Sequence, residues 1–467
     1  MARSVTVVAA RPALLPAAAV VLAALASAWL AARYLALSVD ARYSLAWGAE
    51  LMRGRVPDLG APELTTPHPL PILVAAVLSP LGAPAASEVY GLLMMLSFAL
   101  LLHAAFRLSR LLGGIAAAVI VVLLVGTRPR LAFFAAHGFV DVPFTALVLL
   151  AGAVAAEGPR RNAARALGLL AVAGVLRPEA WALSLIYGAF VILLPGSAHR
   201  DRPRARPLAL AALAVAAPLG WLGFDLALTG DAAHSLNGTR SGAVALERAT
   251  GAEQLWPSFQ LGIERLVGWA VAAAGAVVAV WGVAMARGRR GGFALAAALV
   301  AVGLGAFGVL AYTELPLNDR YLLVPALGLA CLAAAGAGGL ERRSPVPVAA
   351  LLLALGGTLS GVPADLRETT TMLAMSREKR QADADLELLL GRPEVMAAID
   401  RCARVTASGS GRAAAAALLA RDPAQIPIAR SPVPPPGAAA ISTAGSVRRA
   451  TPGVTRQGAW ALVDRCS

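Results

Sequence analysis

Five short polar strings hold the residues of this chain whose side chains could do chemistry. Each string lies where a long apolar run begins or ends. The strings combine carboxylates, which can accept a proton or bind a cation, with arginine and histidine, which can bind an anion. They cover residues 38–43, 65–70, 137–141, 177–179 and 318–321. Their candidate site residues are Asp40, Arg42, Tyr43, His68, His137, Asp141, Arg177, Glu179, Arg320 and Tyr321.

Each string taken alone has a simpler explanation. Ionisable groups at a membrane edge cost little when water reaches them. Asp141 precedes an apolar run and could cap the N-terminus of a helix. Arg320 could extend its guanidinium to the membrane surface. What favours a functional site is the predicted topology, because it brings all five strings to one face of a membrane.

The apolar runs between the strings predict an all-helical protein that crosses a membrane many times. The 467-residue chain is 58% hydrophobic and 15% charged, with a mean hydropathy of +0.69. A soluble protein of this length needs more polar surface. Runs of about 17–25 apolar residues recur, each long enough to cross a bilayer core of about 30 Å. Because the runs are continuous, they favour helices over the alternating strands of a barrel.

The arginines set the orientation. They supply nearly all of the net charge of +14 and cluster in short loops, so positive-inside topology explains them without a nucleic-acid partner. Residues 14–37 form the first run, read as an uncleaved signal-anchor, with cleavage near residues 26–28 as the alternative. Residues 40–88 then form one long external loop. Within it, residues 44–52 and 69–82 are predicted to be interfacial helices on the outer face.

This scheme predicts about eleven transmembrane helices. The predicted inside segments hold sixteen arginines against three acidic residues, and a further span at residues 69–82 would reverse that bias. The N-terminus is therefore expected in the cytoplasm and the C-terminus outside it. The predicted spans are residues 14–37, 89–106, 114–125, 144–156, 166–176, 180–194, 208–228, 266–284, 292–312, 321–340 and 346–361.

Two regions are expected, a membrane region at residues 1–363 and an extracytoplasmic tail or small domain at residues 364–467. Residues 377–390 and 393–402 of the tail have a helical pattern. Cys402 and Cys466 fall in this external part, where they form either a disulfide or two separate thiols. Cys331 is read as a small apolar residue inside a span. The sequence contains no CxxC or HExxH motif that would indicate a metal site.

The order and spacing of the strings resemble the GT-C superfamily of integral-membrane glycosyltransferases, such as the protein O-mannosyltransferases and the lipid A aminoarabinose transferase. Residues 40–43 (D-A-R-Y) stand where that superfamily has a D-E-A-R-Y-like string, and residues 68–70 (H-P-L) stand for its Pro-Pro-Leu string. Asp141 matches an acidic residue before the fourth span. Residues 177–179 (R-P-E) match a K-G-P-like break, and residues 320–325 (R-Y-L-L-V-P) match an R-Y-L-x-P string.

The resemblance implies transfer of a sugar from a polyprenyl-phosphate donor to an acceptor hydroxyl outside the membrane, in a mannosyltransferase-like reaction. It implies that Asp40 is the general base, and that Asp141 orients the acceptor or binds a divalent cation together with Asp40. The chain departs from the pattern at Ala41 and Pro67, where the family often has Glu and Lys. The donor phosphate is accordingly expected at His68, Arg177 and Arg320, with Arg128 and Arg240 as further candidates. Contacts to the substrates are expected from Arg42, Tyr43, His137, Glu179 and Tyr321.

A single displacement with inversion at the anomeric carbon is expected, because Asp40 has no clear second nucleophile beside it. The Ala- and Arg-rich, Lys-poor composition indicates a bacterial genome rich in G and C, and hence a bacterial plasma membrane and cell envelope. Two alternatives stay open. A transporter or lipid flippase would carry charged or broken segments at the bilayer midplane and an internal repeat. A non-catalytic membrane assembly protein would use the tail as its binding module.

Overall fold

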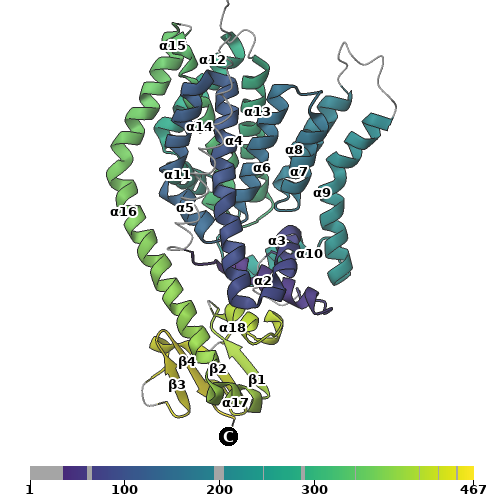
Figure 1. Ribbon diagram of the computed structural model, residues 1–467, viewed down its shortest axis with the longest axis vertical. Coiled ribbons are helices and arrows are strands. Elements are labelled where there is room, and N and C mark those ends of the chain that lie inside the picture. Colours follow the sequence, from purple (N-terminus) through teal and green to yellow (C-terminus); the bar gives the residue numbers. More distant parts are fainter. Residues whose placement is uncertain are drawn as a thin grey trace, which may run out of the picture.

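The computed structural model describes residues 35–59, 66–193, 205–245, 247–285, 290–341, 343–409, 411–429, 431–448 and 451–466. Long helices form the upper part of the molecule in Figure 1, short helices lie beneath them, and a small sheet forms the lower end. The first predicted span, residues 14–37, lies outside the described residues except for residues 35–37.

Apolar helices confirm a multi-pass membrane protein. By length and composition, five helices of the described chain could cross a bilayer, or up to seven if each of two bent helix pairs is one span. Three shorter apolar helices lie among them, so the number eleven stays a prediction. The helices of this bundle are α4 (Ala83–Gly126), α6 (Asp141–Glu157), α7 (Ala163–Gly174), α8 (Glu179–Leu193), α9 (Ala205–Thr229), α12 (Trp269–Met285), α13 (Arg290–Tyr312) and α14 (Leu323–Ala335).

The helix labelled α4 is a hairpin of two arms. Its backbone leaves the helical region at Gly114, where φ is 85° and ψ is −169°, a conformation that glycine adopts without steric cost. A Cβ atom on Gly126 would lie 3.7 Å from a methyl carbon of Leu102, whereas a straight helix would separate these residues by about 36 Å. The chain therefore reverses at Gly114. The predicted spans at residues 89–106 and 114–125 fall in the two arms.

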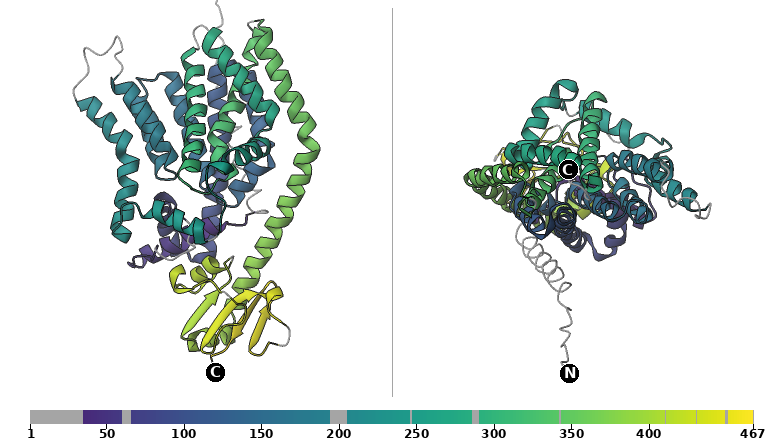
Figure 2. Two further views of the ribbon diagram at one scale, coloured as in Figure 1. Left: turned by 180° about the vertical axis from the view of Figure 1, so that it is seen from behind. Right: turned by 90° about the horizontal axis from the view of Figure 1, so that it is seen from above.

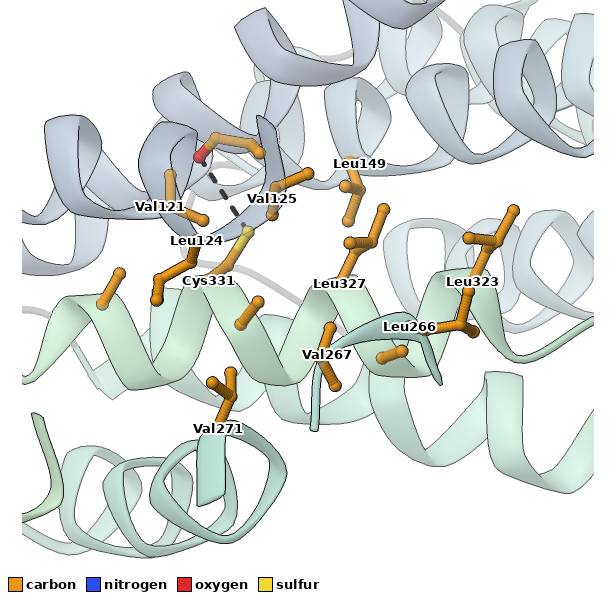
Figure 3. Packing of buried hydrophobic residues seen from close by; sticks show 14 of the residues in the cluster. Val121, Leu124, Val125, Leu149, Leu266, Val267, Val271, Leu323, Leu327 and Cys331 are labelled. Carbon is orange, nitrogen blue, oxygen red and sulfur yellow. Dashed lines mark hydrogen bonds between the residues drawn. The ribbon is translucent and has the colours of Figure 1, made fainter. Parts of the chain in front are cut away.

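The apolar core of the bundle is centred on α14, nearly all of whose residues are buried. Figure 3 shows Cys331 of this helix between Val125 of α4 and Val271 of α12. The Cys331 thiol donates a weak hydrogen bond to the Ala105 carbonyl at 3.9 Å. Its complete burial agrees with the expectation of a small apolar residue inside a span.

Short helices cover the end of the bundle that faces the sheet. Two of them, α2 (Val39–Met52) and α3 (Pro69–Leu78), correspond to the predicted interfacial helices, and their place at a membrane surface stays a prediction. Ser38 caps α2, its hydroxyl accepting a hydrogen bond from the Ala41 N–H at 3.2 Å. This cap fixes the start of the helix that carries Asp40. The others are η1 (Ser79–Leu81), α5 (Pro129–Ala136), α10 (His234–Ala245), η2 (Ala252–Gln254), α11 (Leu255–Leu266), η3 (Asp319–Leu322) and, at the far end, α15 (Gly338–Glu341).

The helix α16 (Pro345–Leu390) connects the far end of the bundle to the C-terminal unit. Its 46 residues correspond to a length of about 69 Å. Figure 2 shows it from behind, running along one side of the molecule to the sheet. The helix continues through residues 363 and 364 without a break, so the expected domain boundary there stays a prediction.

The C-terminal unit is built on a four-stranded sheet in the order β1-β2-β4-β3. Strand β1 pairs with β2 in parallel, and the other two pairs are antiparallel. The helices predicted at residues 377–390 and 393–402 are the end of α16 and α17. A disulfide joins Cys402 to Cys466, which is one of the two states that the sequence allowed. The elements are α17 (Pro393–Arg401), β1 (Arg404–Ala407), α18 (Arg412–Leu418), η4 (Pro423–Gln425), β2 (Ala438–Thr443), η5 (Ala444–Ser446), β3 (Val454–Gln457) and β4 (Trp460–Asp464).

Candidate active site

Helix starts and breaks bring charged residues from four of the strings to one place. Asp40 lies in the first turn of α2, and Asp141 is the first residue of α6. Arg177 and Glu179 stand at the break before α8, and Arg320 lies in η3. The residues come from distant parts of the sequence, and ion pairs connect all of them.

Arg320 bridges the two aspartates. One terminal nitrogen lies 3.4 Å from an oxygen of Asp40, and Nε lies 3.4 Å from an oxygen of Asp141. The guanidinium also lies over the ring of Phe139, 4.5 Å from its centroid, a contact that stabilises a cation without neutralising it. Arg320 is therefore fixed by two acids and one aromatic face rather than extended freely to a membrane surface.

Arg177 is a second, more deeply buried cation. It forms ion pairs with Asp141 and with Glu179, and its Nε lies 3.1 Å from both carboxylate oxygens of Glu179. Its guanidinium stacks over Tyr321 at 4.2 Å from the ring centroid. Since α6 has no side-chain cap hydrogen bond among the described residues, the Asp141 carboxylate serves the two arginines and not the helix terminus.

His68 lies at the rim of this cluster, at the N-cap of α3. Burial, followed by the nearby positive charge of Arg177, lowers the pKa of His68 to about 4. Its ring meets Trp221 edge-on, with the centroids 5.6 Å apart. Its Nδ1 atom is buried, and the described residues offer it no hydrogen-bond partner. At neutral pH this imidazole is uncharged, so it can give a phosphate a hydrogen bond but not a charge.

His137 contacts residues that position the site and does not lie in its centre. Its carbonyl oxygen accepts a hydrogen bond from the Ser38 N–H at 2.7 Å. Its ring stacks on Phe133 at 3.8 Å, and Nδ1 lies 2.9 Å from the Phe133 carbonyl oxygen. His137 thus ties the start of α2 to α5, and this contact places Asp40.

Arg42 of α2 faces away from the cluster, and Tyr43 of the same helix packs beside Trp47. Arg42 follows Asp40 by two residues, about 200° around a helix, and it pairs with Asp383 of α16. Tyr43 is buried and stacks on Trp47, with the ring centroids 5.3 Å apart. Their predicted contacts to substrates stay predictions, and in this structure both residues join α2 to its neighbours.

The two further arginine candidates are engaged elsewhere. Arg128 donates a hydrogen bond to the Val267 carbonyl at 2.8 Å and pairs with Asp365 at 3.4 Å. Arg240 donates to the Thr313 carbonyl at 3.3 Å. These contacts give both arginines a structural use apart from the central cluster.

A divalent cation was predicted to bind Asp40 and Asp141 together. Arg320, and not a further ligand, lies between Asp40 and Asp141. In the described part of the chain, the group of three or more close metal-ligating side chains consists of Cys402, Asp464 and Cys466, and its cysteines are joined in the disulfide. Binding of a divalent cation by Asp40 and Asp141 stays a prediction.

A small cleft of ≈ 20 Å³ lies beside the cluster. Its lining combines Arg177 and Arg320 with apolar residues, among them Leu183 of α8 and Leu310 of α13. A larger cavity of ≈ 700 Å³ lies beside α2, α3, α16 and α18, on the Arg42 side of α2. The two guanidiniums of the cluster thus share the small cleft with apolar side chains.

Several residues of the site escaped the sequence analysis. Phe139 and Trp221 contact Arg320 and His68. Phe139 lies within the string 137–141 but was not named as a site residue, and Trp221 lies in an apolar run outside the strings. Asp383 pairs with Arg42 across 341 residues of chain. A charged residue in a polar helix gives no signal of such a distant partner, so only the fold reveals it.

Solved membrane proteins share this fold, although no protein-family model and no curated protein matches the sequence. ArnT from Cupriavidus metallidurans bound to undecaprenyl phosphate is 14% identical, with a TM-score of 0.58 over 97% of each chain. The Archaeoglobus fulgidus oligosaccharyltransferase in the apo form is 12% identical, with a TM-score of 0.52 over 90% of this chain and 65% of that chain. Its complex, AglB with an inhibitory peptide and a dolichol-phosphate, is 12% identical, with a TM-score of 0.50 over 92% of this chain and 69% of that chain. Identities this low show a common fold, and this is the fold that the sequence resemblance implied.

Proposed function

We propose that this chain, which has the GT-C fold, transfers a sugar from a polyprenyl-phosphate donor to an acceptor hydroxyl at the extracytoplasmic face of a bacterial plasma membrane. The observation that carries the proposal is the Asp40–Arg320 pair at 3.4 Å, located where a charged cluster meets an apolar cleft. A carboxylate that can take a proton thus lies next to a guanidinium that can hold a departing phosphate.

A donor that is a phosphate joined to a hydrocarbon needs cations next to apolar side chains. Arg177 and Arg320 line the cleft together with Leu183, Phe307 and Leu310. A guanidinium has five N–H donors, so each arginine can keep its carboxylate partners and still donate to a phosphate oxygen. The solved ArnT carries undecaprenyl phosphate and the solved AglB carries a dolichol-phosphate, which supports a lipid phosphate as the partner here.

The reaction follows from the positions of these groups. Asp40 accepts the proton of the acceptor hydroxyl while the hydroxyl oxygen bonds to the anomeric carbon. The bond from that carbon to the phosphate oxygen breaks, and the electron pair leaves with the polyprenyl phosphate, where Arg320 and Arg177 stabilise the negative charge. Asp141 holds both arginines in place. A single displacement of this kind inverts the anomeric configuration, and a product that retains it would contradict the mechanism.

The proposed orientation follows from the same cluster and the C-terminal unit. Helix α2, which carries Asp40, and the sheet lie toward the same end of the molecule (Figure 1). A disulfide such as Cys402–Cys466 persists in an oxidising compartment, which supports an extracytoplasmic C-terminus. Labelling of single cysteines introduced in the sheet, from outside intact cells, tests this orientation.

The central experiment measures turnover of labelled polyprenyl-phosphate sugars by the detergent-purified protein. Asp40→Asn should lower turnover by about 10²–10⁴-fold, because it removes the general base, while the melting temperature stays near that of wild type. Glu157→Gln is the matched control, since it neutralises an acid of the partly exposed Arg107–Glu157 pair away from the cluster. Absence of turnover by wild type across a broad donor panel would reject the proposal, and so would full activity of Asp40→Asn.

A further inference from the structure

Acidic residues of α16 pair with arginines that lie next to both members of the Asp40–Arg320 pair. We propose that α16 is a clamp: Asp383 and Glu368 are positioning residues that hold Asp40 and Arg320 at their working separation. The inference rests on the proposed function for its kinetic readout. Its structural readout is independent of any activity.

The first arm of the clamp holds α2. Arg42 stands two residues after Asp40 and pairs with Asp383, and both side chains are largely buried, at 14% and 28% exposure. The Arg42 Nε also donates to the Leu37 carbonyl at 3.2 Å, which ties the guanidinium to the chain just before the helix. Because Arg42 and Asp40 belong to the same turn of α2, a displacement of Arg42 also displaces Asp40.

Asp383 separates two like charges. Lys379, one turn earlier on α16, interacts electrostatically with both Arg42 and Asp383. With the carboxylate present, the three groups form a cation–anion–cation arrangement between α2 and α16. Without the Asp383 carboxylate, no attraction from that group offsets the repulsion between the positive charges of Arg42 and Lys379. The loss of one carboxylate thus turns an attraction between the two helices into a repulsion.

The second arm holds η3. Glu368 lies 3.3 Å from the Nε of Arg130, and the same nitrogen lies 3.5 Å from an oxygen of Asp319. The other oxygen of Asp319 accepts a hydrogen bond from the Arg320 N–H at 2.9 Å. The chain of contacts therefore ends on the backbone of the arginine that faces Asp40.

The two arms are held apart by a rigid spacer. Glu368 and Asp383 are fifteen residues apart in the unbroken helix α16, or about 22 Å along its axis. Asp365, which pairs with Arg128 at 3.4 Å, adds a third contact close to Glu368. Because α16 contacts both α2 and η3, the length of α16 between these contacts sets the distance between Asp40 and Arg320. The Asp40–Arg320 ion pair does not set that distance alone.

The variants Asp383→Asn and Glu368→Gln test the clamp, with Glu157→Gln as control and Asp383→Glu as conservative rescue. Misplacement of a reacting group by about 1 Å costs on the order of 10²-fold. Asp383→Asn should therefore lower kcat by about 10–100-fold, leave the donor KM and the melting temperature near those of the control, and recover in Asp383→Glu. Equal kcat in Asp383→Asn and the control would overturn the inference. A fall in kcat that only follows a lower melting temperature would overturn it as well.

Hydrogen–deuterium exchange provides the readout that needs no substrate. Asp383→Asn should speed exchange of the α2 amides, and Glu368→Gln that of the residues around η3, while Glu157→Gln changes neither. Unchanged exchange in both segments would overturn the clamp. If wild type turns over no donor, the proposed function fails, and the exchange result alone decides the structural role of α16.

Discussion

Asp40 and Asp141 both pair with Arg320, but they differ in exposure and in their other partners. The Asp141 side chain is 3% exposed, and both Arg177 and Arg320 bind it. The Asp40 side chain is 32% exposed, and among the described residues its ion pair is the 3.4 Å contact with Arg320. Asp141 is thus enclosed by its partners, whereas Asp40 still has an open side toward which an acceptor could approach. Two carboxylates in one cluster can therefore serve different purposes, one holding the cations and one reacting.

The largest effect on stability is expected from the loss of Arg177, one of the two cations that enclose Asp141. In Arg177→Met, Asp141 keeps only its pair with Arg320 among the ion pairs described here. Glu179 loses the ion pair described for it. Because buried charges lose their partner, the variant should lose about 3–5 kcal/mol of stability. Unfolding in detergent measures this loss. Arg107→Met, at a partly exposed pair, is the control and should lose about 0–1 kcal/mol. Equal losses in the two variants would mean that the enclosed cluster is solvated after all.

The next effect concerns the arginine that both acids share. Arg320→Lys keeps the positive charge but loses the planar, forked donor set. Asp141 retains Arg177, so the fold should hold, whereas the donor loses one charge-assisted contact of about 1.5–3 kcal/mol, or roughly a tenfold or greater loss of affinity. Equilibrium binding of a lipid phosphate measures the change. Unaltered affinity together with normal turnover would remove Arg320 from the proposed phosphate site.

The pH dependence of stability distinguishes His68 from the charged cluster beside it. The folded protein lowers the pKa of His68 from 6.5 to about 4 through burial and then Arg177. The unfolded chain therefore binds the proton first, and stability falls as the pH drops from 6.5 toward 4. Between pH 7 and pH 5 this amounts to about 1–2 kcal/mol for a partly exposed ring. His68→Asn should lose that part of the acid sensitivity, and identical pH profiles for the two proteins would contradict the assignment.

The smallest effect is expected from the aromatic face beneath Arg177. Tyr321→Leu removes the ring that lies 4.2 Å from the guanidinium and leaves a shorter apolar side chain. The loss of a desolvated cation–π contact should cost about 0.5–2 kcal/mol, measured as a shift of the unfolding midpoint. Tyr321→Phe is the control, because it keeps the ring. If the Phe variant lost as much as the Leu variant, the hydroxyl rather than the ring would be the important group.

The sequence predicted the convergence of the strings because topology is encoded locally. Arginine-rich loops fix which ends of the apolar runs share a side, and that was enough to group Asp40, Asp141, Arg177 and Arg320. Helical periodicity also contains the opposed directions of Asp40 and Arg42, since a two-residue step turns by about 200°. Those parts of the site depended on short-range rules.

Other parts depended on long-range packing, which no local pattern contains. Asp383 meets Arg42 only after 341 residues. The sheet was missed because β2 reads A-A-A-I-S-T, a run poor in the β-branched and aromatic residues that favour strands. Burial of its Ala residues, not their propensity, makes it a strand.

The length of chain between Arg42 and Asp383 has a consequence for biosynthesis. At about 5–20 residues per second, a ribosome needs roughly 20–70 s to make the segment that separates them. During that time the newly inserted α2 has no acidic partner from α16. On the proposed clamp, the geometry between Asp40 and Arg320 is completed only when almost the whole protein has been translated, so a nascent chain contains Asp40 before the contact that would position it.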